Sequence, residues 1–264
     1  MAYEGLQFIF DGVPSQRYGL TLAKFDSSGY RYKGGSDVEV TTFKAPRSPR
    51  QQIQRVEETG VLEFDLEMFS DHPLQPYEVN TIATWMFGQN EYKKFIIQSP
   101  DYSGIYFNCI LNNREDIVIQ NGVNGFKFTV QCDAGGAWTN VKTRSYSSPT
   151  TISVINKSAL NDYTYPDVEI DVSSGTTAIS LINATDGATR ATTFTLNAAS
   201  SGETLKINGD SGEISSSISV NHLAEFNKVY PRLKRGDNSI IVSATGGSVT
   251  SIKFTFQEYV RLGA

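Results

Sequence analysis

One stretch of the chain, residues 74–112, departs from the strand-like patterns that surround it. Within Gln75–Phe87 the apolar residues recur at helical spacing, and they are Val79, Ile82, Ala83 and Met86. Pro76 suits the first turn of a helix, Glu78 favours its positive end, and Gly88 is a natural stop. The pattern predicts one short amphipathic helix against a sheet, with a core-facing side formed by Val79, Ile82, Trp85 and Met86.

Alternation with a period of two on both sides of this helix predicts strands. In Val61–Phe69 the apolar residues Leu62, Phe64, Leu66 and Met68 alternate with Glu63, Asp65 and Glu67. Ile105–Leu111 and Gly125–Cys132 alternate in the same way, and Asn-Gly dipeptides between them are turn signals. The first part of the chain is therefore expected to be an antiparallel β-sandwich with one helix.

The composition fits a globular protein with a core, since 39% of the 264 residues are hydrophobic and 19% are charged. A net charge of −5 argues against a strongly basic nucleic-acid surface. No apolar run approaches the roughly 18 residues of a membrane span, and no secretory signal is recognisable. Cys109 and Cys132 are too few for a disulfide framework and are interpreted as buried thiols of a protein made in a reducing cytoplasm.

The segment Lys44–Gly60 is polar, contains two prolines and interrupts the strands. Long polar excursions in compact domains commonly serve binding or assembly, although a plain surface loop is the alternative. We interpret it as an arm that packs on a neighbouring molecule, with candidate interface residues Lys44, Arg47, Arg50, Gln52, Arg55 and Glu57.

The composition changes near residue 146, because both tryptophans and both cysteines precede it. Short alternating strands separated by Gly, Ser and Asp turns follow, and they are typical of an antiparallel sandwich. We therefore expect two domains, 1–146 with the arm 44–60, and 147–264. The expected fold class is mainly β.

A search for chemistry finds no convincing active site. Gly209–Gly212 has the Gly-Asp-Ser-Gly order of a serine-protease nucleophile, but its flanks are strands, and only His72 and His222 could complete a triad. A tight hairpin turn is the favoured interpretation. Glu63, Asp65 and Glu67 could hold a cation but also suit the solvent side of a strand. No zinc spacing or phosphate loop is present, so no cofactor, metal or enzyme activity is predicted.

Several segments, taken in order, resemble the distal tail proteins of long-tailed, non-contractile bacteriophages. In the first half these are FIFDG with SQRYGL, then VLEFDLEMF running into HPLQPYEVNTIATWMFGQNEYKKFII, then IYFNCIL. In the second half they are INKSALNDYTYPDVEIDV, GETLKINGDSGEI and LKRGDNSIIVSATGGSVTSIKFTFQEYV. Arg235 stands where the family usually has proline. The resemblance covers nearly the whole chain through order and spacing.

The resemblance implies a structural protein of the virion, synthesised in the bacterial cytoplasm and located at the distal tail tip. It implies a homohexameric ring in which the arm embraces the neighbouring subunit and through whose lumen DNA passes without specific binding. It also implies a galectin-like C-terminal β-sandwich, with the tail tube protein and tail-associated or receptor-binding proteins as partners. Contact with a host glycan is a further possibility that the resemblance leaves open.

Two other functions stay open from the sequence. The first is a carbohydrate-binding adhesin, although the second half lacks tryptophan and its aromatic residues mostly sit at strand positions. The second is a hydrolase that uses acidic residues such as Asp65 and Glu67, for which no cleft can be identified from the sequence. The ring-forming tail protein is the leading hypothesis.

Overall fold

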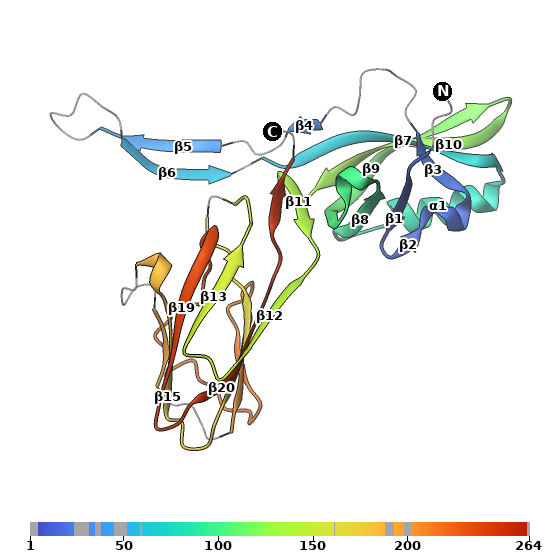
Figure 1. The fold of residues 1–264 in the computed structure, drawn as a ribbon. Coiled ribbons are helices and arrows are strands. Elements are labelled where there is room, and N and C mark those ends of the chain that lie inside the picture. The colour runs from blue at the N-terminus through green and yellow to red at the C-terminus, as the bar shows by residue number, and fades with distance from the viewer. Residues whose placement is uncertain are drawn as a thin grey trace. The chain divides into compact units, whose positions relative to one another are not determined.

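The computed structural model describes residues 5–23, 32–34, 38–44, 52–58, 60–160, 162–187, 193–197 and 202–262. The chain forms two compact units (Figure 1). The N-terminal unit is Met1–Thr139 together with Val260–Ala264, and the C-terminal unit is Asn140–Tyr259. The division at 139/140 differs from the expected boundary at 146, because Lys142–Ser147 is a strand of the second unit.

The N-terminal unit is built on one ten-stranded sheet whose central order is β2-β1-β8-β9-β10-β7-β3. These strands are β1 (Gln7–Phe10), β2 (Val13–Pro14), β3 (Leu20–Ala23), β7 (Leu62–Leu74), β8 (Lys93–Gln98), β9 (Ile105–Ile119) and β10 (Gly122–Cys132). Off this path lie β4 (Tyr32–Gly34), β11 (Gly136–Thr139) and β21 (Tyr259–Arg261), which pair with β7, β9 and β11 respectively. Short 3-10 turns, η1 (Ser15–Tyr18) and η2 (Pro100–Tyr102), complete the unit.

The sheet curls until its two ends meet. Leu6, just before β1, and Leu22 in β3 exchange two backbone hydrogen bonds, of 3.0 and 2.8 Å. Within β7 the residues Leu62, Phe64, Leu66 and Met68 are buried, as the alternation predicted. The inward face of the curled sheet thus encloses an aromatic core that includes Phe8, Phe10, Phe64, Phe95, Phe107, Phe126 and Phe128.

The predicted helix is α1 (Pro76–Phe87), and it is the one α-helix in the part of the chain that the structure describes. Gln75 and Glu78 cap its start reciprocally, and the Gln75 N–H donates to Glu78 Oε2 at 2.8 Å. Ile82 and Met86 are fully buried against the sheet, and Val79 and Trp85 are partly buried beside them. Because Trp85 Nε1 donates to the Phe10 carbonyl at 3.1 Å, the helix end is tied to strand β1.

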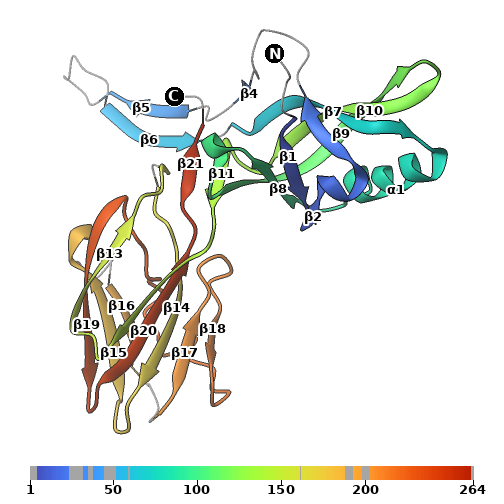
Figure 2. The same ribbon diagram turned by 45° about the vertical axis from the view of Figure 1, so that its right-hand side comes forward.

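The C-terminal unit is a sandwich of two antiparallel sheets (Figure 2). The five-stranded sheet has the order β12 (Lys142–Ser147), β20 (Val249–Phe256), β14 (Asp167–Val172), β17 (Thr204–Ile207) and β18 (Ile214–Ser216). The four-stranded sheet has the order β13 (Thr151–Asn156), β19 (Gly236–Thr245), β15 (Ala178–Asn183) and β16 (Thr193–Leu196), with η3 (Ala184–Asp186) after β15. Alternate residues of both sheets form one core. The prediction of a mainly β, antiparallel, two-part fold with one helix is confirmed.

Strands β5 (Val38–Phe43) and β6 (Gln52–Glu58) form a separate two-stranded sheet, seen as a hairpin in Figure 1. The segment 44–60 therefore contains a complete strand, and the hairpin begins earlier, at Val38. No strand was predicted in Gln52–Glu58, because five of its seven residues are polar and the two apolar ones do not alternate with them regularly. We call Val38–Glu58 the hairpin.

Candidate functional site

The hairpin contains or adjoins the residues that the sequence nominated for a subunit interface. Lys44 directly follows β5 and is exposed. The backbone register places Gln52 opposite Phe43, Arg55 opposite Thr41 and Glu57 opposite Glu39. Arg47 and Arg50 lie outside the described residues.

Strand β5 has no covered face within the described part of the chain. Residues 39–44 are all exposed, and they include Val40 and Phe43, each 46% exposed. Successive strand residues point to opposite sides, so Val40 and Phe43 present an apolar group on each face. A two-stranded sheet is marginally stable alone in water, so this hairpin is suited to packing on another surface.

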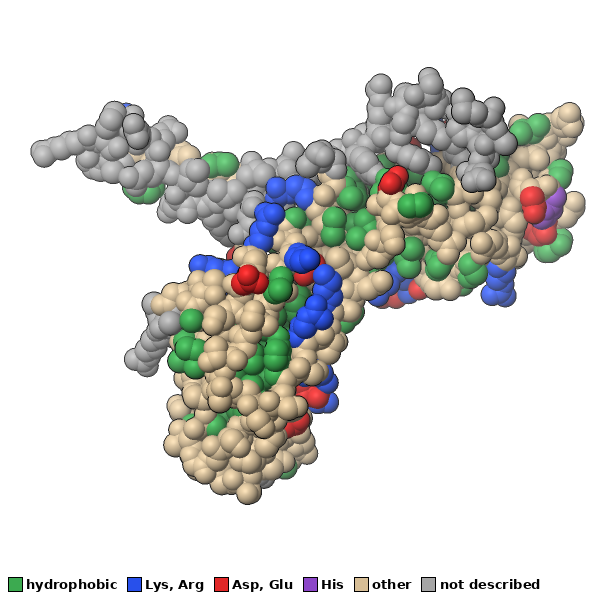
Figure 3. All heavy atoms as spheres, viewed as in Figure 1, with side chains coloured by type: hydrophobic (Ala, Val, Ile, Leu, Met, Phe, Trp, Pro, Cys, Tyr) green, Lys and Arg blue, Asp and Glu red, His purple; other side chains and the backbone are tan. Residues whose placement is uncertain are grey.

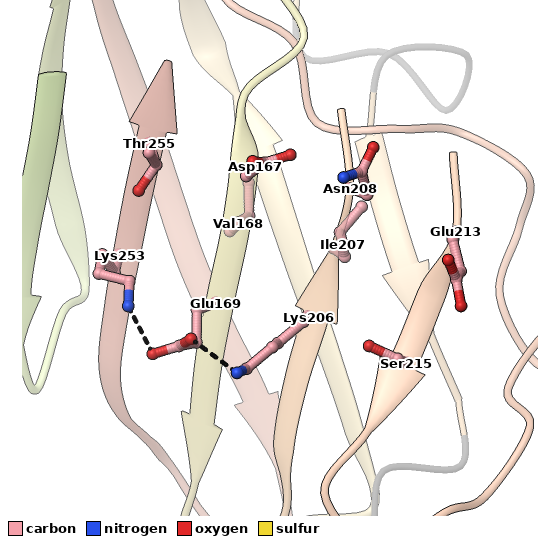
Figure 4. Close-up of a pocket in the computed structure, with 10 residues that line it drawn as sticks. All are labelled: Asp167, Val168, Glu169, Lys206, Ile207, Asn208, Glu213, Ser215, Lys253 and Thr255. Atoms are coloured by element: carbon pink, nitrogen blue, oxygen red, sulfur yellow. Dashed lines mark hydrogen bonds and ion pairs between the residues drawn. The ribbon is translucent and has the colours of Figure 1, made fainter. Parts of the chain in front are cut away.

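A groove of about 370 Å³ lies on the outer side of the five-stranded sheet (Figure 4). Its centre is a charge ladder in which Glu169 accepts from Lys253 Nζ at 2.7 Å and lies 3.4 Å from Lys206 Nζ. The hydrogen bond from Lys253 lowers the pKa of Glu169, so this carboxylate stays charged and is no proton donor at neutral pH. The other described lining residues are Asp167, Val168, Ile207, Asn208, Glu213, Ser215 and Thr255, none of them aromatic.

The opposite outer face, on the four-stranded sheet, is nearly free of charge. Among the residues of β13, β15, β16 and β19, Asp237 alone is charged. Its outward positions are mostly Ser and Thr, with Ile155 and Ile241 exposed at 47% and 39%. Figure 3 shows few charged side chains over these strands. Such a face can pack against a neutral protein surface without desolvating an ion.

The buried carboxylate of Asp186 holds together a partly exposed ionic cluster in the C-terminal unit. Its carboxylate accepts from Arg232 Nε at 2.7 Å and Tyr163 Oη at 3.0 Å, and it lies 3.3 Å from Lys234 Nζ. The Arg232 guanidinium also stacks over the Tyr163 ring at 3.8 Å. Burial opposes ionisation of Asp186, but these three donors outweigh it and lower its pKa. The cluster fastens η3 to the segment that precedes β19.

His222 and Glu203 form a second buried pair, with Nε2 and Oε1 2.6 Å apart. Ser216 Oγ donates to the same Glu203 oxygen. The serine hydroxyl thus contacts the carboxylate and not the imidazole, so His222 is not placed to take its proton. Because His222 and Glu203 are each 1% exposed, this cluster is a core element that anchors the loop after β18.

Gly209–Gly212 is the turn between β17 and β18, where Ile207 pairs with Ile214. Ser211 Oγ donates to Asn208 Oδ1 at 3.0 Å, and the Asp210 and Ser211 N–H groups donate to that same oxygen. Gly212 has a φ of +68°, a conformation that favours glycine. The interpretation as a hairpin turn is confirmed.

The acidic residues of β7 do not converge on a metal site. Asp65 accepts from Thr129 Oγ1 at 2.8 Å, while Glu63 and Glu67 pair in register with Gln131 and Lys127. No group of three His, Cys, Asp or Glu side chains suited to a metal occurs among the described residues. Cys109 and Cys132 are both buried and both free.

His72 lies at the entry to α1 in an exposed acidic setting. Its Nδ1 is 2.5 Å from Asp71 Oδ1, and its Nε2 is 3.5 Å from Glu78 Oε1. Hydrogen bonds to Asp71 and Glu78 raise the pKa of His72 above its ordinary value of 6.5, and the bond to Asp71 has the larger effect.

We therefore expect His72 to titrate above pH 6.5 in an NMR pH series of its ring protons, assigned with the variant His72→Gln. Since the folded-state pKa is raised, the stabilising contact is complete below the unfolded pKa and is lost as the pH rises through the folded value. Asp71→Asn should bring the titration back toward 6.5. An unchanged pKa in that variant would show that Asp71 is not the cause.

Two family profiles cover the chain almost end to end. A profile described as "Phage tail protein N-terminal domain" matches residues 3–134, which is half of the chain. A second, described as "Phage tail C-terminal domain", matches residues 136–256. The chain belongs to this family of phage tail proteins. No curated protein sequence matches it.

The whole fold of this tail protein resembles that of a solved phage protein. The crystal structure of SPP1 Dit (gp 19.1), described as a paradigm of the hub adsorption apparatus in phages that infect Gram-positive bacteria, matches with a TM-score of 0.67 at 12% identity. The match covers 96% of this chain and 98% of that one. A chain of the phage P2 baseplate in its activated conformation with Ca matches with a TM-score of 0.49 at 10% identity, over 97% and 98% of the two chains.

No helix in the described part of the tail protein combines the length and hydrophobicity of a membrane span. The ionic cluster of Asp186 and the groove around Glu169 were not predicted from the sequence. Their residues are far apart along the chain, and the single weak signal was the alternation of charges in Asp167–Val172. The turn predicted at Gly209–Gly212 is present, whereas the segment predicted as the polar arm Lys44–Gly60 contains strand β6, which pairs with β5.

Proposed function

We propose that this tail protein is a distal tail hub, a homohexameric ring at the end of the tail of a long-tailed phage. The ring joins the tail tube to the host-adhesion apparatus and lets DNA pass through its lumen without specific binding. Its location is the tail tip of the virion, and its role is structural and not enzymatic. The observation that carries this proposal is the similarity in fold to SPP1 Dit across both units, together with the matching phage tail profiles.

The hairpin supports the assembly part of the proposal. Residues 39–43 of β5 are exposed on both faces, and among the described residues the two-stranded sheet joins none of the three larger sheets. A second copy of the tail protein is the partner that would cover it, with Lys44, Arg47, Arg50, Gln52, Arg55 and Glu57 as proposed contact residues. In a ring, every hairpin would reach an identical neighbouring surface, so all subunits would be equivalent.

The outer faces of the C-terminal sandwich support attachment of other proteins. The face of the four-stranded sheet is nearly free of charge and carries Ile155 and Ile241 exposed. This composition suits a tail-associated or receptor-binding protein better than a charged polymer. The groove around Glu169 is polar, and its described lining lacks the aromatic ring on which a sugar would stack. Direct glycan binding is therefore the second candidate, and a glycan array with the purified protein tests it.

Native mass spectrometry of the purified tail protein tests the proposed ring. We expect a hexamer, whose annular shape and open lumen negative-stain electron microscopy would show. The measurement should be repeated over a wide concentration range, because a ring closed by identical contacts assembles cooperatively. A strictly monomeric protein at high concentration, and in the presence of tail tube protein, would contradict the proposal.

A further inference from the structure

The two cysteines occupy directly opposed positions on neighbouring strands. Cys132 in β10 pairs in register with Cys109 in β9, in the middle of the N-terminal sheet. Opposed residues of an antiparallel pair project to the same side of the sheet. Both side chains are fully buried in the core, so they share one enclosed apolar environment.

The hydrogen-bond pattern shows which kind of pair this is. The next pair along is Asp133 and Asn108, and there the Asp133 N–H donates to the Asn108 carbonyl at 2.9 Å. Hydrogen-bonded and non-hydrogen-bonded pairs alternate along an antiparallel ladder, so Cys109 and Cys132 form a non-hydrogen-bonded pair. Such pairs have the closer side chains and a Cα separation of about 4.5 Å. Disulfides span Cα separations of about 4.4 to 6.8 Å, so the backbone already lies within reach of a bond.

Side chains next to the pair hold this register. Asn108 Nδ2 donates to Asp133 Oδ2 at 2.6 Å, and Trp138 Nε1 donates to Asp133 Oδ1 at 3.3 Å. These contacts join β9, β10 and β11 at the pair of residues adjacent to the cysteines. A slip of β10 against β9 would break them, so the opposition of the two thiols is a fixed feature of the fold.

We propose that Cys109 and Cys132 are a modification site at which a small-molecule disulfide oxidises the tail protein to form a cross-strand disulfide. One cysteine loses its proton to solvent, and its thiolate attacks a sulfur of the oxidant and expels one thiolate. The second cysteine, likewise deprotonated, attacks the mixed disulfide and expels the second thiolate. The two expelled thiolates take up two protons. The cysteine pair is thus oxidised by two electrons, and the small disulfide is reduced to two thiols.

Burial makes this site slow to react. It raises the pKa of Cys132 to about 12 and raises that of Cys109 as well, so both remain thiols at neutral pH. Oxidation therefore requires transient opening of the sheet, or takes place before folding is complete. Once formed, the bond would be shielded from reductants in the same way. Its closure would link two central strands of the N-terminal unit.

The proposal is tested by refolding the full-length chain in mixtures of reduced and oxidised glutathione, which brings the dithiol and disulfide forms of the cysteine pair to equilibrium. The disulfide fraction is measured after acid quench and alkylation, from intact mass, both in native buffer and in concentrated urea. We expect the ratio of disulfide to dithiol to be at least about 100-fold higher in the native chain than in urea. Forming the bond in the unfolded chain costs conformational entropy, whereas the native fold already holds the two cysteines together. Cys109→Ser and Cys132→Ser, each with one thiol, measure the background of mixed disulfides.

A native ratio equal to or below the ratio in urea would overturn the proposal, since the fold would then oppose the bond. The oxidised chain should also unfold at a temperature about 5 to 10 °C higher, followed by the fluorescence of Trp85 and Trp138 in the same unit. This outcome does not depend on ring formation, so the disulfide and the proposed hub function can fail separately.

Discussion

Replacing both Val40 and Phe43 by glutamate is expected to leave the tail protein monomeric under conditions where the natural chain forms the proposed ring. Both side chains are 46% exposed and lie on opposite faces of β5, outside either core. The substitutions should therefore spare the fold of the subunit. If the hairpin lies in an interface, each substitution would remove the roughly 1.5–3 kcal/mol that burial of an apolar side chain contributes to association. Each would also place a carboxylate in the buried interface, which weakens association further. We expect each subunit contact to weaken by at least about 100-fold, measured by analytical ultracentrifugation.

The matched control replaces two similarly exposed apolar residues elsewhere. Ile218 and Val220, in the loop after β18, are 47% and 42% exposed. The variant Ile218→Glu/Val220→Glu carries the same added charge and should still form the ring. Circular dichroism melts should match among the natural chain and both variants. A hairpin variant that keeps its hexamer would show that the hairpin is not a subunit contact.

The second large effect concerns the stability of the C-terminal unit. Asp186→Asn is expected to lower its free energy of unfolding by about 2 kcal/mol at neutral pH, because Arg232, whose side chain is 23% exposed, loses the buried carboxylate to which it donates a hydrogen bond. The side chain of Lys234 is 44% exposed, so the loss of its ion pair adds little. Both tryptophans lie in the N-terminal unit, so their fluorescence gives an internal reference that should not change. Hydrogen exchange of β15 and β19, measured by mass spectrometry, locates the loss.

The pH dependence of this loss follows from the lowered pKa of Asp186. The carboxylate contributes fully above its unfolded value, and the contribution disappears as the pH falls through the lower folded value. The natural chain and Asp186→Asn should therefore become equally stable in acid. Asp237→Asn, an exposed position on β19, is the control and should change stability by less than about 0.5 kcal/mol. Equal effects of the two variants at neutral pH would contradict the role given to the buried Asp186 carboxylate.

Local periodicity was enough to predict most of the N-terminal unit. The helix was found because four apolar residues repeat at its pitch, and β7 was found because its inward side chains alternate with acids. Strand β6 was missed because its residues are mostly polar and show no regular alternation of apolar and polar side chains. The Asp186 cluster was missed for another reason. Its members, Tyr163, Asp186, Arg232 and Lys234, come together only when strands distant in sequence pair.

The end of the chain was also beyond local reasoning. Residues 142–147 resemble the strands on either side of them, so no pattern placed the boundary before β12. Strand β21 has only three residues and follows directly on the C-terminal sandwich, yet it pairs with β11 and so belongs to the sheet of the N-terminal unit. Nothing in so short a segment specifies a partner more than a hundred residues away in the chain.

The pairing of β21 with β11 affects how the tail protein responds to proteolysis. A protease that cleaves between β11 and β12 separates residues 1–139 from the rest, but β21 stays on the second fragment and pairs with a strand of the first. Backbone hydrogen bonds and the packing of Leu262 on the N-terminal core would hold the nicked halves together. A cut after Tyr259 removes only the last five residues and leaves the covalent link at 139/140 intact. A single cleavage at either of these two connections therefore leaves the two fragments associated.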